Sequence, residues 1–193
     1  TALIGTNGAG KSTLLKTIMG ILKGKGEISV NGKPVSQYST KDFSSTVSYL
    51  SQDNDCKVNL SVFEVVMLGR MGSMSFRVSD EDIAATQEVL ERLNLQRFAS
   101  RSIMELSGGQ RQLVFMAQAL VKEPKILILD EATANIDSET EELIQNSLEK
   151  MRKGRTTIAI AHRLSTIQDS NCIYVLDKGE IIESGTHEEL IAL

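Results

Sequence analysis

The sequence predicts an α/β fold in which helices flank a mainly parallel sheet, with a helical sub-lobe inserted between two sheet-forming parts. Short runs of β-branched residues alternate along the chain with stretches of helical periodicity. The run at 126–129 is apolar at every position, which is typical of a strand covered on both faces. From residue 61 to residue 101 helical patterns replace strand patterns, so the insertion is placed there.

The composition supports one globular domain and excludes several classes of protein. The chain has 193 residues, of which 41% are hydrophobic, enough to bury a core. Its net charge of −4 argues against a nucleic-acid binder. The longest aliphatic run, 126–129, is too short to cross a bilayer. Cys56 and Cys172 are isolated, which indicates a reducing compartment without disulfide or zinc chemistry.

The first elements are read from strand runs and turn signals. A strand at 2–4 leads through a glycine-rich loop to a helix that runs to about Met19. Asn31-Gly32 predicts a hairpin turn, since both residues accept positive φ. A further buried strand is expected at 47–50.

Helical signals dominate the middle of the chain. Ser79 is predicted to cap a helix, with Asp82 three residues on. We expect its apolar face to consist of Ile83, Val89, Leu90 and Leu93. A second helix is expected at 108–121, with Leu113, Met116, Ala117 and Leu120 facing inward.

The remaining elements complete the alternation. After the strand at 126–129, Ser138 and Glu141 predict a capping box at the start of a helix. A buried strand follows at 156–161. The runs 172–176 and 179–183 then predict a hairpin that turns at Asp177-Lys178, and a short amphipathic segment from His187 closes the chain.

The glycine-rich loop carries the strongest functional signal. It fits the pattern G-x-x-x-x-G-K-[ST] between a strand and a helix, the P-loop of nucleoside triphosphatases. Its glycines let successive backbone N–H groups face phosphates, Lys11 reaches the β- and γ-phosphates, and Ser12 ligates Mg²⁺. The predicted phosphate-binding residues are Gly5, Thr6, Asn7, Gly8, Ala9, Gly10, Lys11, Ser12 and Thr13.

Two carboxylates follow the strand at 126–129. Asp130 would lie at the carboxyl end of this strand, where α/β proteins bind ligands, and is expected to hold Mg²⁺. Glu131 is expected to act as the general base that polarises the attacking water.

A second anion cradle is predicted at Ser107, Gly108, Gly109 and Gln110, which open a helix after Leu106. This LSGGQ sequence is specific, and with it the chain resembles the ATP-binding cassette (ABC) ATPases over essentially its whole length.

The resemblance implies roles for three further positions, Gln52, His162 and Asp137. Gln52 matches the Q-loop glutamine, which contacts Mg²⁺ and senses the γ-phosphate. His162 matches the switch histidine that contacts the γ-phosphate, and with Glu131 and Lys11 it completes the expected catalytic set. Asp137 lies where the family has its D-loop and is expected to serve communication across a dimer.

The resemblance also implies domain division, partners and location. Residues 1–60 and 102–193 would form a RecA-like core, and 61–101 the helical signature sub-lobe, extending to about 121. Two cassettes would pair head to tail, so that residues 107–110 of one complete the ATP site of the other. Transmembrane permease subunits would be the other partners, which places the domain on the cytoplasmic face of the cell membrane. The expected cofactors are ATP and Mg²⁺.

Branch signals within the family conflict. The segment at 62–70 resembles importer ATPases for iron-siderophore, haem and cobalamin uptake, whereas 130–137, 161–167 and 185–190 resemble exporter cassettes. Because the helical lobe docks the membrane partner, we predict an importer, with an exporter as the alternative. A soluble ABC ATPase acting in translation is the alternative from another class. The family's adenine-stacking aromatic residue is absent before Gly5, so an N-terminally truncated cassette with weakened ATP affinity is expected.

Overall fold

The structure is a computed structural model that describes most of the chain. The described residues are 1–51, 59–71, 78–130, 154–160 and 170–192, together with positions 147, 149, 152, 167 and 168.

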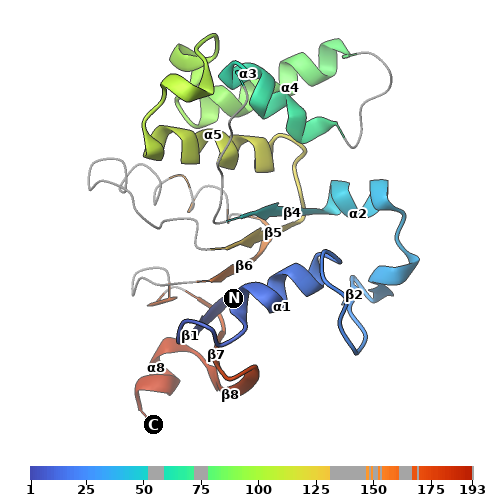
Figure 1. Ribbon diagram of the computed structural model, residues 1–193, viewed down its shortest axis with the longest axis vertical. Coiled ribbons are helices and arrows are strands. Elements are labelled where there is room, and N and C mark those ends of the chain that lie inside the picture. Colours follow the sequence, from blue (N-terminus) through green and yellow to red (C-terminus); the bar gives the residue numbers. More distant parts are fainter. Residues whose placement is uncertain are drawn as a thin grey trace.

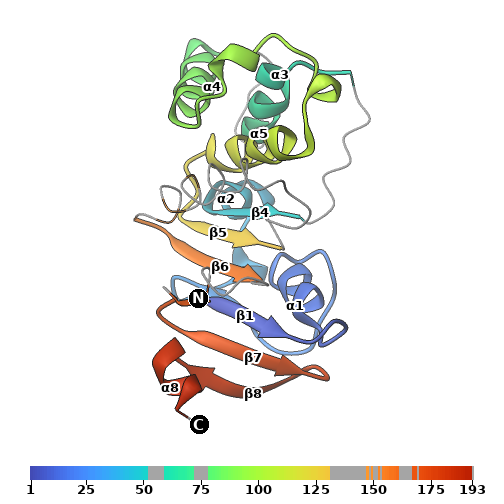
Figure 2. The same cartoon turned by 90° about the vertical axis from the view of Figure 1, so that its left-hand side faces the viewer.

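A mixed sheet forms the centre of the described structure (Figures 1 and 2). Its strands lie in the order β4-β5-β6-β1-β7-β8, and all neighbours are parallel except the antiparallel pair β7 and β8. The predicted mainly parallel α/β fold is therefore confirmed. The bounds are Ala2–Gly5 for β1, Val47–Leu50 for β4, Ile126–Leu129 for β5, Thr156–Ile160 for β6, Ile173–Asp177 for β7 and Glu180–Gly185 for β8.

Strand β5 separates two hydrophobic cores. Leu127 and Leu129 belong to the core shared with the helical part of the molecule. Ile128 points to the other face and packs in the core around Leu15 of α1, the helix Lys11–Ile18. This alternation explains the uninterrupted apolar run, because both faces of β5 are covered. The register of the parallel strands also brings the carboxyl ends of β1 and β5 to the same edge of the sheet.

Helices α3, α4 and α5 pack together beyond β4 (Figure 1). Their bounds, with the 3-10 turns between them, are Val62–Met67 (α3), Leu68–Arg70 (η2), Asp80–Arg92 (α4), Gln96–Phe98 (η3), Ile103–Glu105 (η4) and Gly108–Leu120 (α5). The residues predicted to face inward on α5 are all buried. At Gly69 the chain lies so close to α5 that an added Cβ would stand 2.1 Å from the Gln118 carbonyl oxygen.

The predicted cap at Ser79 is present and is tied to an ion pair. Ser79 accepts from the Asp82 backbone N–H, and the Asp82 carboxylate accepts from the Ser79 backbone and hydroxyl. Arg70 Nε also donates to Asp82, at 2.5 Å. Hydrogen bonds lower the pKa of Asp82 to about 2. The hydrogen bond from the Ser79 hydroxyl contributes most, and the one from Arg70 contributes next. This cluster fixes the start of α4 against η2.

Several local expectations were wrong. Helix α2, Thr40–Thr46, was not predicted, although Ser39 and Asp42 supply its N-cap. Ile83 is 38% exposed, not part of the buried face of α4. The β7–β8 turn lies one residue later than expected, at Lys178-Gly179, because both residues have the positive φ (48° and 86°) that this tight turn requires.

The peripheral elements are short. The hairpin predicted at Asn31-Gly32 is present, with both turn residues at positive φ. Its strands are β2, Ser29–Val30, and β3, Lys33–Pro34, followed by the 3-10 turn η1, Val35–Gln37. Helix α8, His187–Ile191, closes the chain beside β8. The helix predicted from Ser138 lies outside the described residues.

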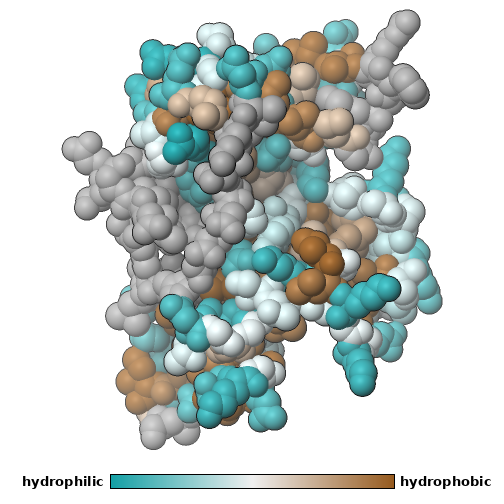
Figure 3. All heavy atoms as spheres, viewed as in Figure 1, coloured by the Kyte–Doolittle hydropathy of each residue, from teal (hydrophilic) through white to brown (hydrophobic). Residues whose placement is uncertain are grey.

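On the face shown in Figure 3, hydrophilic residues are mixed with exposed hydrophobic residues in both the sheet part and the helical part. Met71 and Ile191 are among the most exposed, at 60% and 71%. None of the helices in the described ranges combines the length and apolar character that crossing a bilayer requires.

Candidate functional site

The glycine-rich loop connects β1 to α1, as predicted. Gly10 adopts the left-handed conformation (φ 100°) as the N-cap of α1, so the loop turns sharply into the helix. At Gly5 (φ 148°) an added Cβ would lie 2.1 Å from the Leu176 carbonyl oxygen of β7. The backbone therefore approaches its neighbour so closely that no side chain fits. The result is a helix N-terminus behind a tight loop, a geometry that binds phosphate.

Lys11 lies within the loop and is only 5% exposed. Its ammonium group donates to the carbonyl oxygens of Gly5 (2.9 Å) and Thr6 (3.0 Å). Because a lysine ammonium has three N–H donors, the two carbonyls leave one for an anion. The loop thus holds a nearly buried positive charge at the N-terminus of α1.

Ser12 and Asp130 meet at the carboxyl edge of the sheet, although they are far apart in the sequence. The Ser12 hydroxyl donates to Asp130 Oδ1 at 2.9 Å, and the Tyr49 hydroxyl donates to Asp130 Oδ2 at 2.8 Å. Asp130 is 2% exposed, and its backbone N–H is bonded to the Leu50 carbonyl. A hydroxyl and a carboxylate held together beside a phosphate-binding loop form an oxygen donor set that suits Mg²⁺.

The β7–β8 turn supports the loop from outside. The Gly179 N–H donates to the Ala9 carbonyl at 3.0 Å, and the Ala9 N–H donates to the Thr6 carbonyl at 3.1 Å. Ala9 itself is buried. The central part of the loop is therefore fixed by backbone bonds before any ligand binds.

The second predicted cradle forms the N-terminus of α5. Ser107 caps the helix by accepting from the Gln110 N–H (3.3 Å), and the Gln110 side chain accepts from the Ser107 N–H (3.2 Å). Ser107 and Gly108 are exposed. An added Cβ at Gly108 would meet nothing within 4 Å. The start of this helix is thus preformed and open on one side.

The structure brings together Lys11, Ser12 and Asp130, and it places residues 107–110 on the separate helical part. Four predicted site residues, Gln52, Glu131, Asp137 and His162, lie outside the described residues.

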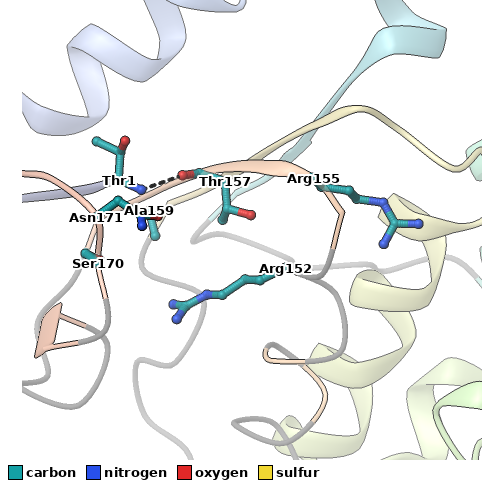
Figure 4. A pocket seen from close by; sticks show the side chains of 7 residues that line it. All are labelled: Thr1, Arg152, Arg155, Thr157, Ala159, Ser170 and Asn171. Atoms are coloured by element: carbon teal, nitrogen blue, oxygen red, sulfur yellow. Dashed lines mark hydrogen bonds between the residues drawn. The ribbon is translucent and has the colours of Figure 1, made fainter.

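A cavity of about 160 Å³ lies at the opposite edge of the sheet (Figure 4). It is lined by Thr1, Arg152, Arg155, Thr157, Ala159, Ser170 and Asn171. These residues include the amino ends of β1 and β6, whereas the phosphate loop and Asp130 lie at carboxyl ends. The cavity is therefore separate from the predicted nucleotide site.

The fold and this site define a P-loop nucleoside triphosphatase with a helical insertion. The family model for ABC transporters matches residues 1–134, and the chain belongs to this family. It is therefore an ATP-binding domain of the type that hydrolyses ATP in ABC transporters.

Similar proteins carry the same domain within longer chains. A multidrug resistance ABC transporter ATP-binding and permease protein of Lactococcus lactis subsp. cremoris is 38% identical, with 99% of this chain and 33% of that protein covered. An ATP-dependent lipid A-core flippase of Xanthomonas oryzae pv. oryzae is 40% identical, with 100% of this chain and 33% of the relative covered. The chain thus spans about a third of the length of these relatives.

A solved structure supports the same assignment. A bacterial Atm1-family ABC exporter with ATP bound matches with a TM-score of 0.79 and 33% identity, covering 99% of this chain and 34% of the other.

These comparisons give no support to the importer prediction. That prediction depended on residues 62–70, and within this segment the structure explains Gly69 by local packing. Gly69 is required because η2 and α5 approach each other closely, and a packing requirement of this kind is a poor marker of transport direction.

Two contacts of the site were not predicted. The sequence predicts Tyr49 only as part of a buried strand, but the structure packs it on the face of the sheet that α1 covers. The sequence places Gly179 in a hairpin but gives no sign of its bond to Ala9, because a long-range backbone hydrogen bond leaves no local pattern.

Proposed function

We propose that this chain is the nucleotide-binding domain of an ABC exporter and that it binds and hydrolyses Mg²⁺-ATP at the loop formed by residues 5–13. The hydrogen bond from Ser12 to Asp130 carries the site assignment, since it joins the loop to the sheet edge and brings two oxygen ligands that suit Mg²⁺ together. The exporter assignment is supported by the relatives named above and by the exporter-like segments 130–137, 161–167 and 185–190.

In this proposal the loop binds the triphosphate. Backbone N–H groups of the loop, other than that of Ala9, which is bonded to Thr6, would donate to the phosphate oxygens together with the N-terminus of α1. Lys11 supplies positive charge to the β- and γ-phosphates through the N–H not directed at the loop carbonyls. Since two carbonyls already orient the ammonium group, little reorganisation is needed when phosphate binds.

The residues present fit Mg²⁺. Ser12 and Asp130 would hold the ion, with Gln52 as a further ligand, and the bound ion would neutralise charge on the β- and γ-phosphates. Glu131 would orient and deprotonate the attacking water, and His162 would contact the γ-phosphate. These roles follow the family resemblance of the residues.

A second cassette completes the site in this proposal. Residues 107–110 of that cassette would donate to the γ-phosphate, and Asp137 would contact the partner. The exposure of Ser107 and Gly108 supports this role, because the cradle opens outward. Transmembrane permease segments would be the other partner, which places the domain at the cytoplasmic face of the membrane. We also propose the division into a core of 1–60 and 102–193 and a helical sub-lobe of 61–101, extending to about 121.

The site assignment is tested by two substitutions in the purified protein. Glu131→Gln should retain ATP binding and lose hydrolysis, and Lys11→Ala should lose binding. ATP affinity is measured by calorimetry and turnover by phosphate release. Unchanged turnover in Glu131→Gln, or native affinity in Lys11→Ala, would contradict the assigned role.

The direction of transport is tested in inverted membrane vesicles, where an exporter accumulates substrate inside the vesicle when ATP is added outside. ATP-dependent loss of a preloaded substrate from such vesicles would contradict the exporter proposal.

A further inference from the structure

Tyr49 lies outside every motif named above, yet it contacts the carboxylate on which the proposed metal site depends. Its hydroxyl donates to Asp130 Oδ2 at 2.8 Å, while Oδ1 accepts from Ser12 at 2.9 Å. The two oxygens of the carboxylate are therefore held by donors from two different elements, β4 and α1.

Strand register explains why Tyr49 reaches this position. Tyr49 pairs with Ile128 in the parallel β4–β5 ladder, and Asp130 follows two residues later on the same face as Ile128. Tyr49 packs against the core that contains Ile128 and Leu15 of α1. The Tyr49 side chain thus packs against this core, and its hydroxyl reaches Asp130 at the edge of the sheet.

We propose that Tyr49 is a positioning residue for the divalent cation of the nucleotide site. By holding Oδ2, its hydroxyl fixes the rotation of the Asp130 carboxylate so that Oδ1 faces Ser12, where the ion would bind. This inference rests on the proposed function, since it takes Ser12 and Asp130 as the metal-binding pair.

The physical argument concerns preorganisation. A carboxylate held at one oxygen can rotate about its terminal torsion, which has broad minima. Hydrogen-bond partners outside the metal ligands set ligand orientation, and their removal typically weakens metal binding about 10- to 100-fold. Tyr49→Phe removes the hydroxyl and keeps the ring that packs in the core, so it separates orientation from packing.

The experiment measures metal affinity directly in the intact protein. Mn²⁺ is titrated against the protein saturated with a non-hydrolysable ATP analogue, and binding is followed by electron paramagnetic resonance. The affinity for the same analogue is measured separately in EDTA. Tyr174→Phe is the matched control, because Tyr174 is a partly buried tyrosine packed against the same core. Asp130→Asn tests the metal site itself.

The proposal expects Tyr49→Phe to bind Mn²⁺ about 10- to 100-fold more weakly, with unchanged analogue affinity in EDTA and with native behaviour of Tyr174→Phe. Native Mn²⁺ affinity in Tyr49→Phe, or equal losses with and without metal, overturns it. If Asp130→Asn also keeps native Mn²⁺ affinity, the proposed metal site fails. If Asp130→Asn loses the metal and Tyr49→Phe does not, only the role of Tyr49 fails.

Discussion

Replacing Gly5 with alanine is expected to destabilise the protein more than the same change at Gly8, although both glycines belong to the phosphate loop. Gly5 has φ 148° and its added Cβ would lie 2.1 Å from the Leu176 carbonyl oxygen. That carbonyl belongs to β7, which pairs with β1 at this register, so it cannot move away without disturbing the sheet. Gly8 has φ 84°, and its added Cβ would meet nothing within 4 Å.

The expected difference follows from two separate costs. An alanine at positive φ costs roughly 1–3 kcal/mol of backbone strain at either position. The overlap at Gly5 adds roughly 1–3 kcal/mol, as overpacking in a close-packed interior does. Gly5→Ala should therefore lower the free energy of unfolding by about 2–6 kcal/mol, and Gly8→Ala by about 1–3 kcal/mol.

Urea unfolding of the two variants tests this reasoning. With a denaturant slope of about 2 kcal/mol/M, the midpoint of Gly5→Ala should lie roughly 0.5–1.5 M below that of Gly8→Ala. Equal midpoints would show that β1 and β7 separate easily, and the steric argument would then be refuted.

Two further predictions concern the helical part. Gly69→Ala should lower the free energy of unfolding by about 1–3 kcal/mol, because its Cβ would meet the Gln118 carbonyl oxygen at 2.1 Å. Gly108→Ala is the control, because an added Cβ there would meet nothing within 4 Å. Equal urea midpoints for the two variants would contradict the prediction for Gly69. Hydrogen bonds, the largest contribution coming from Ser79, lower the pKa of Asp82 from 3.8 to about 2. The stability that the ionised Asp82 carboxylate contributes is therefore present above about pH 4 and is lost as the pH falls towards 2. The stability difference between the native protein and Asp82→Asn should shrink over that window, and a difference constant with pH would argue against the cluster.

The sheet was predictable because its signals are local. The apolar run at 126–129 predicted β5. Both faces of this strand are covered by hydrophobic cores, as is typical of a strand in a parallel sheet. Helix α2 was missed because its seven residues carry no apolar periodicity and no buried side chain. Its cap, Ser39 with Asp42, was the available signal.

Residues of the site could be predicted only where a known sequence motif requires them to lie together. Lys11, Ser12 and Asp130 follow from sequence patterns that require them to meet, and the structure brings them together. Tyr49 and Asp130 are 81 positions apart in the sequence, and their contact depends on the pairing of β4 with β5. No local sequence pattern predicts this pairing. The bond from Gly179 to Ala9 likewise depends on which strand lies beside β1.

The two predicted anion cradles are connected through strand β5 of the sheet. Helix α1 begins at the phosphate loop and packs against the face of β5 that carries Ile128. Leu127 and Leu129, on the other face of β5, share a core with α5, whose N-cap is Ser107. Residues in close-packed interiors have little freedom to shift independently. Strand β5 also ends at Asp130, so a disturbance of the proposed metal site acts on the strand that lies between both helices. We therefore expect that ligand binding at one predicted cradle changes the dynamics of the other through β5. Leu127→Ala, which alters no residue of either predicted cradle or of the proposed metal site, should weaken this coupling. The measurement is the change in hydrogen exchange of α5 amides when ATP binds; the same change in Leu127→Ala as in the native protein would show that β5 does not carry the coupling.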